Sequence, residues 1–234
     1  IGQNQYVRIL EVSKIAKENK IDVGFVHDPD ADRLVLIDQN GEIVFEEYTL
    51  ALAVESILSK NPGGVVVTNL STSKMSEDIA SKYGGKCFYT KIGEGNVVEG
   101  MKKYGAIIGG EGNGGVIYPA INTARDSFAG IALILELLAK RGETLTEITS
   151  KMPKYFMKKD KYSLGVDLQE VYGKLKEVFK DARTDEQDGI RFDFADGSFV
   201  HIRPSNTEPI IRLFGEAKTE ERIEELFRIA KENI

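Results

Sequence analysis

Three aspartates alternate in one short segment, and this spacing suits a site for a hard metal ion. Asp28, Asp30 and Asp32 lie between two apolar, β-branched runs at residues 23–26 and 34–37. Carboxylates about 4 Å apart repel by roughly 1 to 4 kcal/mol per pair unless a cation lies among them. Oxygen ligands without a set of thiolates or imidazoles suit Mg²⁺, Mn²⁺ or Ca²⁺. Because both flanking runs are expected to be buried, we favour a metal site over the alternative, a solvated acidic turn.

An EF-hand would also begin with alternating aspartates, but the rest of this segment does not fit one. Counted from Asp28, the sixth position is Arg33 instead of Gly, and the twelfth is Gln39 instead of Glu. Magnesium held by a few carboxylates keeps coordination positions open for a substrate phosphate. The aspartates therefore indicate phosphoryl chemistry more than a closed calcium site.

A second polar segment, residues 203–209, has the composition of a phosphate-binding loop. It contains one guanidinium, two hydroxyls and an amide, from Arg203, Ser205, Thr207 and Asn206. Arginine forms forked, charge-assisted hydrogen bonds to phosphate, and successive backbone N–H groups in a turn can bind an anion. A hairpin turn that begins at a proline and happens to be polar explains the segment almost equally well when it is considered alone.

A glycine-rich segment, residues 109–115, surrounds one acid and one amide. Glycines such as Gly110 let the backbone approach a ligand closely, and Glu111 and Asn113 could bind sugar hydroxyls. Taken alone, this segment would more simply be a flexible connecting loop. After it, Arg125 and Asp126 precede an expected helix, where we expect a helix cap and a surface ion pair.

The elements that must position these segments follow two patterns. Strands and helices alternate up to residue 152, which predicts a parallel-sheet α/β region with helices on both faces. From Pro153 onward, four expected strands and two helices predict an α+β domain with an antiparallel sheet. We expect three parts: residues 1–40 with the aspartates, residues 41–152 with the glycine-rich segment, and residues 153–234 with the polar loop.

Composition excludes several classes of function. The chain of 234 residues has 37 acidic and 31 basic side chains, a net charge of −6, which argues against a general binder of nucleic acid or anionic membrane. The single cysteine, Cys87, cannot form an internal disulfide, and two histidines argue against a histidine-rich metal centre. Charged residues near the start and the lack of a long apolar stretch argue against a signal peptide or a membrane span. We expect a soluble, cytoplasmic protein.

Together and in this order, the three segments resemble those of the α-D-phosphohexomutase superfamily, which includes phosphomannomutase/phosphoglucomutase and phosphoglucosamine mutase. The resemblance covers essentially the whole chain and matches the end of the family's second domain, its third domain and its fourth. It implies a Mg²⁺ site at Asp28, Asp30 and Asp32, with Arg33 as a catalytic residue beside it. It also implies substrate binding by two loops, through Gly110, Glu111, Asn113, Arg203, Ser205, Asn206 and Thr207. Two residues depart from the family pattern, since Pro29 replaces the usual Gly and Asn113 stands where Ser is frequent.

The resemblance implies an isomerase that interconverts hexose 1-phosphate and hexose 6-phosphate through a phosphoserine and a hexose 1,6-bisphosphate. The family's phosphoserine lies in a Ser-His-Asn-Pro type motif, and here neither His27 nor His201 follows a serine. We therefore expect the phosphoserine to come from missing N-terminal domains of the same protein, and the chain alone to be inactive. Two alternatives are a noncatalytic phosphosugar-binding or regulatory module and, less favoured, a magnesium-dependent phosphatase built on Asp28. The sequence does not choose among glucose, mannose and glucosamine phosphates.

Overall fold

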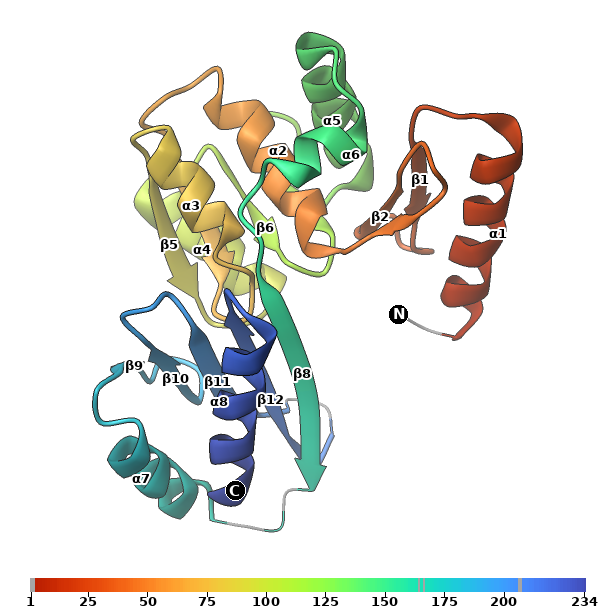
Figure 1. Ribbon diagram of the computed structural model, residues 1–234. Coiled ribbons are helices and arrows are strands. Elements are labelled where there is room, and N and C mark those ends of the chain that lie inside the picture. The colour runs from red at the N-terminus through yellow and green to blue at the C-terminus, as the bar shows by residue number, and fades with distance from the viewer. Residues whose placement is uncertain (1–2, 164, 166, 206–207) are drawn as a thin grey trace. The chain divides into compact units, whose positions relative to one another are not determined.

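The computed structural model describes residues 3–163, 165, 167–205 and 208–234. The chain forms two compact units, Ile1–Pro153 and Lys154–Ile234. The first unit contains two sheets and the second unit contains one (Figure 1). Among the described residues, no helix is long and apolar enough to span a bilayer.

The first unit begins with a helix and a small antiparallel sheet. These elements are α1 (Gln3–Asn19), β1 (Gly24–His27), β2 (Leu34–Ile37) and β3 (Ile43–Val44). The strand order is β1-β2-β3, and His27 pairs with Leu34, so that the aspartate segment is the connection between two paired strands. Apolar side chains of the helix and the strands, among them Ile9, Val26 and Ile37, share one buried core. This core fixes both ends of the aspartate segment.

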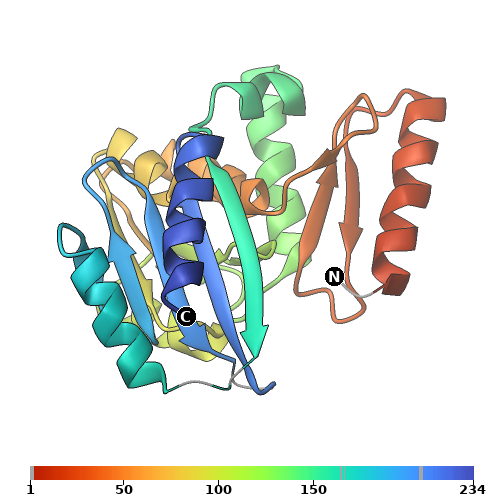
Figure 2. The ribbon, with the colours of Figure 1, turned by 60° about the horizontal axis from the view of Figure 1, so that its bottom comes forward.

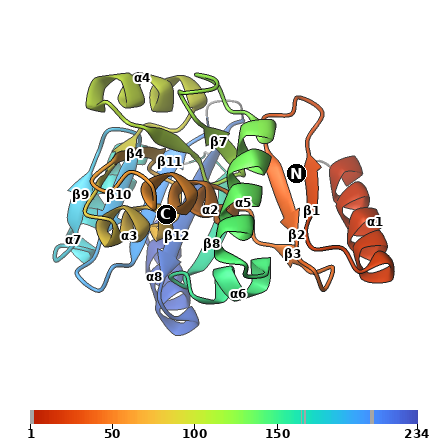
Figure 3. The same cartoon turned by 90° about the horizontal axis from the view of Figure 1, so that it is seen from above.

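The larger sheet of the first unit has the strand order β5-β4-β6-β7. Its strands are β4 (Val65–Asn69), β5 (Lys86–Thr90), β6 (Ile108–Glu111) and β7 (Gly115–Ile117). Both β5 and β6 pair with β4 in parallel, and β7 pairs with β6 in antiparallel orientation. Helix α4 (Glu94–Tyr104) covers one face of this sheet (Figure 3). The other face is covered by α2 (Glu47–Leu58), α3 (Met75–Lys82) and α5 (Ser127–Arg141), so the predicted α/β class is confirmed.

The parallel strands end together in a group of polar side chains. Strands β4, β5 and β6 end at Asn69, Thr90 and Glu111, respectively. Parallel strands have their carboxyl ends at one edge of the sheet, and ligand sites of open α/β sheets usually form just outside that edge. We therefore expect a ligand-binding site of the larger sheet at this edge.

The second unit is a five-stranded antiparallel sheet with the strand order β8-β12-β11-β10-β9. Its strands are β8 (Phe156–Ser163), β9 (Arg183–Asp185), β10 (Ile190–Asp193), β11 (Phe199–Pro204) and β12 (Ile210–Ala217). Helices α7 (Leu168–Val178) and α8 (Glu220–Glu232) lie on the same side of this sheet (Figure 2). Their apolar residues, such as Leu175 and Leu226, share one core with Phe192, Ile202 and Leu213 of the strands. The predicted α+β class with an antiparallel sheet is confirmed.

Three details differ from the sequence prediction. The glycine-rich segment is mostly paired strand, because β6 extends through Glu111 and β7 begins at Gly115. Strand β9 was not predicted, because three residues are too few to show an alternating pattern. Helix α6 (Leu145–Ser150) was also missed, although Thr144 and Glu147 form a capping box at its start, a signal that the sequence does contain.

Candidate functional site

The aspartate segment is held in a compact turn by its own backbone. The carboxylate of Asp28 is buried, and its Oδ1 accepts hydrogen bonds from the amides of Asp32 (3.1 Å) and Arg33 (3.2 Å). Ala31 has a φ of 56°, a left-handed conformation that is uncommon for a residue other than glycine. Its carbonyl accepts a 2.9 Å hydrogen bond from the amide of Ser127, the first residue of α5. The turn is thus attached to a long helix about a hundred residues further along the chain.

The two ends of this turn have carboxyl groups with opposite pKa shifts. Burial works to raise the pKa of Asp28, but hydrogen bonds from Asp32 and from the Arg33 and Asp32 amides lower it overall. Burial raises the pKa of Asp32, and the neighbouring Asp28 carboxyl group adds to this rise, against the opposing charge of Arg125. The carboxyl groups of Asp28 and Asp32 are therefore close enough to interact directly.

The turn offers oxygen ligands of the kind that magnesium prefers, although three acids are not gathered. Within the described ranges, no group of three or more His, Cys, Asp or Glu side chains is arranged to hold a metal ion, and Asp30 is exposed. The Oδ1 of Asp32 is buried and has no hydrogen-bond partner among the residues that the structure describes, so this oxygen is not used by the protein itself. Magnesium is often bound by only one or two carboxylates together with substrate phosphate. The donor set of Asp28 and Asp32 fits that mode of binding.

Arg33 remains available on the surface beside this turn. Its side chain is 45% exposed, and its Nε lies 3.7 Å from Asp28 Oδ2 and 3.8 Å from Asp32 Oδ1. These distances are too long for direct hydrogen bonds. The guanidinium could therefore turn toward an anionic ligand at little cost.

Arg125 connects the aspartate turn to the end of strand β6. Its Nη2 donates to Asp32 Oδ2, its Nη1 donates to Glu111 Oε2 at 2.6 Å, and its Nε lies 3.4 Å from Glu94 Oε2. The side chain of Arg125 is only 12% exposed. The prediction of a surface ion pair at Arg125 was therefore wrong, whereas the predicted helix cap is confirmed, since Asp126 accepts hydrogen bonds from two amides at the start of α5.

Glu111 lies at the carboxyl edge of the larger sheet, within a network of hydrogen bonds. Its Oε1 accepts from Asn69 Nδ2 at 2.7 Å and from the Gly93 amide at 3.1 Å, and its Oε2 binds Arg125. Asn113 is half-buried, and its Oδ1 accepts a 3.2 Å hydrogen bond from the Gly115 amide. These bonds hold the predicted sugar-binding residues of the hairpin in place.

The glycine hairpin, defined here as residues 109–117, is also attached to the small sheet. The amide of Leu34, which follows the aspartate turn, donates a 3.0 Å hydrogen bond to the carbonyl of Gly114. Gly110, which precedes Glu111, is buried within β6. The structure therefore brings together two of the three predicted loops, through this backbone bond and through Arg125.

The predicted phosphate loop lies in the second unit. Arg203 is buried in β11, and its Nε lies 3.4 Å from Asp188 Oδ2. Ser205 Oγ accepts a 3.3 Å hydrogen bond from Nε of Arg212, a cation on β12 that sequence reasoning did not single out. The other two predicted members, Asn206 and Thr207, lie outside the described residues.

His201 is a structural residue of the strand that leads to this loop. It is completely buried, and its Nε2 donates a 2.6 Å hydrogen bond to the carbonyl of Asp188. Burial lowers the pKa of His201 to about 4, because the surroundings disfavour the charged ring. His201 is therefore a neutral, buried part of the second unit near neutral pH.

His201 should make the stability of the second unit sensitive to acid. In the unfolded chain the pKa of a histidine is about 6.5, so between pH 6.5 and 4 only the unfolded state binds this proton. The free energy of unfolding should therefore fall by up to about 3 kcal/mol over this range from His201 alone. Urea denaturation of the parent and of His201→Gln at pH 7 and pH 4.5 measures the difference. An equal loss in both proteins would contradict this role.

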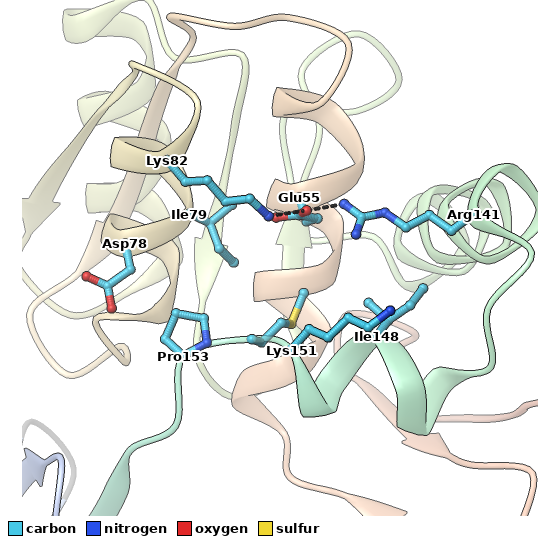
Figure 4. Close-up of a pocket in the computed structure, with 9 residues that line it drawn as sticks. Glu55, Asp78, Ile79, Lys82, Arg141, Ile148, Lys151 and Pro153 are labelled. Carbon is cyan, nitrogen blue, oxygen red and sulfur yellow. Dashed lines mark hydrogen bonds and ion pairs between the residues drawn. The ribbon is translucent and has the colours of Figure 1, made fainter.

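A separate cavity of about 380 Å³ in the first unit contains none of the predicted site residues (Figure 4). Lys82 and Arg141 lie on either side of the buried carboxylate of Glu55. Oε1 of Glu55 accepts from Lys82 Nζ at 3.0 Å, from the Tyr83 hydroxyl at 2.8 Å and from Arg141 Nη2. Burial opposes ionisation of Glu55, but its hydrogen bonds with Lys82 and Tyr83 lower its pKa overall. These hydrogen bonds satisfy the buried carboxylate of Glu55, and they connect α2, α3 and α5.

Two models of known protein families match the sequence of this chain. The sequence model described as "Phosphoglucomutase/phosphomannomutase, alpha/beta/alpha domain III" matches residues 46–155. The model described as "Phosphoglucomutase/phosphomannomutase, C-terminal domain" matches residues 157–231. The chain therefore belongs to the phosphoglucomutase/phosphomannomutase family, and the resemblance to the phosphohexomutase superfamily is confirmed.

Individual relatives show how much of a family member the chain represents. It is 38% identical to the phosphoglucomutase/phosphomannomutase of Thermococcus kodakarensis, over 92% of this chain and 48% of the relative. A family protein from Burkholderia thailandensis has a similar structure, with a TM-score of 0.81, 27% identity, and coverage of 96% of this chain and 49% of that one. The N-acetylphosphoglucosamine mutase of Aspergillus fumigatus, solved with GlcNAc-6P and magnesium, shares the fold at a TM-score of 0.62 and 15% identity, over 88% of this chain and 47% of that one. The chain thus spans about half the length of the curated relatives it matches.

Proposed function

We propose that this chain is the C-terminal portion of a phosphohexomutase that interconverts hexose 1-phosphate and hexose 6-phosphate. The observation that carries the proposal is the bridge formed by Arg125, which joins Asp32 of the aspartate turn to Glu111 of the glycine hairpin. A mutase must hold a metal-activated phosphoryl group next to a sugar ring, and these two loops are the expected source of both functions. Membership of the family supports this assignment.

Each loop then has a role that follows from its chemistry. Asp28 and Asp32, joined by the exposed Asp30 of the same turn, would hold Mg²⁺, which when bound neutralises charge on the transferring phosphoryl group. Arg33, exposed beside these acids, would contact the phosphoryl oxygens as a catalytic residue.

The remaining loops would hold the substrate. Glu111 and Asn113, with Gly110 allowing close approach, would accept hydrogen bonds from sugar hydroxyls. The phosphate that is not being transferred would bind the loop of the second unit, through Arg203, Ser205, Asn206 and Thr207. Phosphoryl transfer depends mainly on positioning and on neutralising charge, which explains why the candidate residues are acids, arginines and hydrogen-bonding groups.

The phosphoserine would be supplied by a segment of the same protein outside these 234 residues. After the first transfer, the hexose 1,6-bisphosphate would turn around in the site and return its other phosphoryl group to the serine. The chain covers only about half of each relative, which supports a source for the phosphoserine outside these residues. The identity of the hexose depends on contacts of Glu111 and Asn113 with individual hydroxyls.

A coupled assay with glucose, mannose and glucosamine 1-phosphates tests the proposal. The chain alone, given a hexose 1,6-bisphosphate primer, should show negligible turnover, and the protein extended through its upstream reading frame should be active. Robust turnover by the chain alone would contradict the need for an external phosphoserine. An extended protein that binds hexose phosphates without turnover would instead support the noncatalytic phosphosugar-binding module.

A further inference from the structure

Arg125 holds one carboxylate of the aspartate turn and one of the glycine hairpin at the same time. It uses a different nitrogen for each, with Nη2 on Asp32 Oδ2 and Nη1 on Glu111 Oε2. The side chains of Arg125, Asp32 and Glu111 are 12%, 21% and 5% exposed. Poor access of water means that the charges in this cluster are weakly screened from one another.

The charges in this cluster do not balance. Arg125 faces the three acids Asp32, Glu94 and Glu111, and the more exposed Arg33 adds a second positive charge that, of these three, lies near only Asp32, at 3.8 Å. A change in the charge of one acid therefore alters how firmly the shared guanidinium binds the others. The two oxygens of Asp32 differ, because Oδ2 binds Arg125 while the buried Oδ1 has no hydrogen-bond partner within the described part of the chain.

We propose that Arg125 is a positioning residue that couples the metal turn to the sugar-binding hairpin. It fixes Asp32 through Oδ2 and leaves Oδ1 for a cation, and it fixes Glu111 through Oε2. This inference rests on the proposed function, because it assumes that the turn binds Mg²⁺. A cation at Asp32 Oδ1 withdraws negative charge from that carboxylate and weakens its bond to Arg125 through Oδ2, so Arg125 binds Glu111 more firmly. By thermodynamic reciprocity, a change at Glu111 must alter the affinity of the turn for Mg²⁺.

Calorimetric titration of the chain with MgCl₂ measures this coupling. Glu111→Gln should weaken Mg²⁺ binding by at least about fivefold. The substitution removes one negative charge, and it leaves Arg125 free to bind Asp32 more tightly in competition with the ion. Glu55→Gln is the matched control, because Glu55 is an equally buried acid bound to an arginine in the other cluster. This control should leave the affinity for Mg²⁺ within about twofold of the parent, since it has no contact with Arg125.

The Arg125→Lys background separates the bridge from a direct charge effect. Lysine keeps the positive charge but lacks the planar fork that reaches two carboxylates with separate nitrogens. In this background, Glu111→Gln should change the Mg²⁺ affinity by less than about twofold. An effect equally large in both backgrounds would overturn the role of Arg125, because charge alone would then explain it.

The Gly93 amide provides a readout that needs no substitution. It donates a 3.1 Å hydrogen bond to Glu111 Oε1, so its NMR shift reports on that carboxylate. During a Mg²⁺ titration of the parent, this signal should move with the midpoint found by calorimetry. If the parent binds Mg²⁺ but Gly93 stays unmoved and Glu111→Gln keeps the parent affinity, the coupling is refuted and the metal site stands. If the parent does not bind Mg²⁺, the proposed metal site itself fails, and the coupling fails with it.

Discussion

Replacing Arg125 with methionine is expected to lower the free energy of unfolding by about 3 to 5 kcal/mol. The guanidinium binds Asp32 and Glu111 and lies beside Glu94, and the side chain of Glu111 is almost completely buried. Methionine keeps much of the apolar volume but leaves the buried Glu111 without its positively charged partner. Breaking a buried ion pair by removing one partner is costly because the remaining charge cannot return to water.

Urea denaturation at pH 7, followed by circular dichroism, measures this loss. Arg228→Met is the control, since Arg228 forms an ion pair with Glu232 in which both side chains are about 60% exposed. Exposed pairs contribute about 0 to 1 kcal/mol, so this control should stay close to the parent. Equal losses in the two variants would show that the Arg125 cluster is no stronger than a surface ion pair.

Gly114→Ala is expected to cost about 2 to 4 kcal/mol of unfolding free energy, from backbone strain together with overpacking. Gly114 has a φ of 88°, which disfavours any residue with a side chain. An added Cβ would lie 2.4 Å from the Leu34 carbonyl oxygen, far inside van der Waals contact. The same Leu34 donates its amide to the Gly114 carbonyl, so relief of the clash would separate the hairpin from the aspartate turn.

Gly63→Ala separates the backbone cost from the clash. Gly63 has a similar φ of 80°, but no atom of the described residues lies within 4 Å of an added Cβ. The Gly63→Ala variant should lose only about 1 to 2 kcal/mol of unfolding free energy, which is the cost of the left-handed conformation. The two alanine variants, compared by urea denaturation, should therefore differ clearly. If they lose the same amount, the contact between Gly114 and Leu34 is not important for stability.

The fold class could be predicted from the sequence because it depends on local patterns. Strand β5 and helix α5 belong to the alternation of strands and helices that was predicted up to residue 152. These elements have strong period-two or helical patterns of apolar residues, which a single sequence displays directly. Strand β9 has no such pattern, since it is defined by its pairing with β10, a partner that the local sequence does not reveal.

The candidate site could be predicted only in part, for a related reason. Asp28, Glu111 and Arg203 were singled out as candidates from residue type and spacing within short segments. Arg125 was missed, because its importance comes from Asp32, 93 positions away along the chain, and from the edge of a sheet. Asn69 was missed for the same reason, although the rule that ligands bind at the carboxyl ends of parallel strands would have indicated the end of β4.

Helix α5 has a buried ionic cluster at each end. Arg125 lies just before its N-cap, and Arg141 is its last residue and binds Glu55. One residue inserted between them would rotate one end of the helix by about 100° relative to the other. Only one of the two arginines could then face its acids, so both the length of this helix and its angular phase are fixed by the chemistry at its ends.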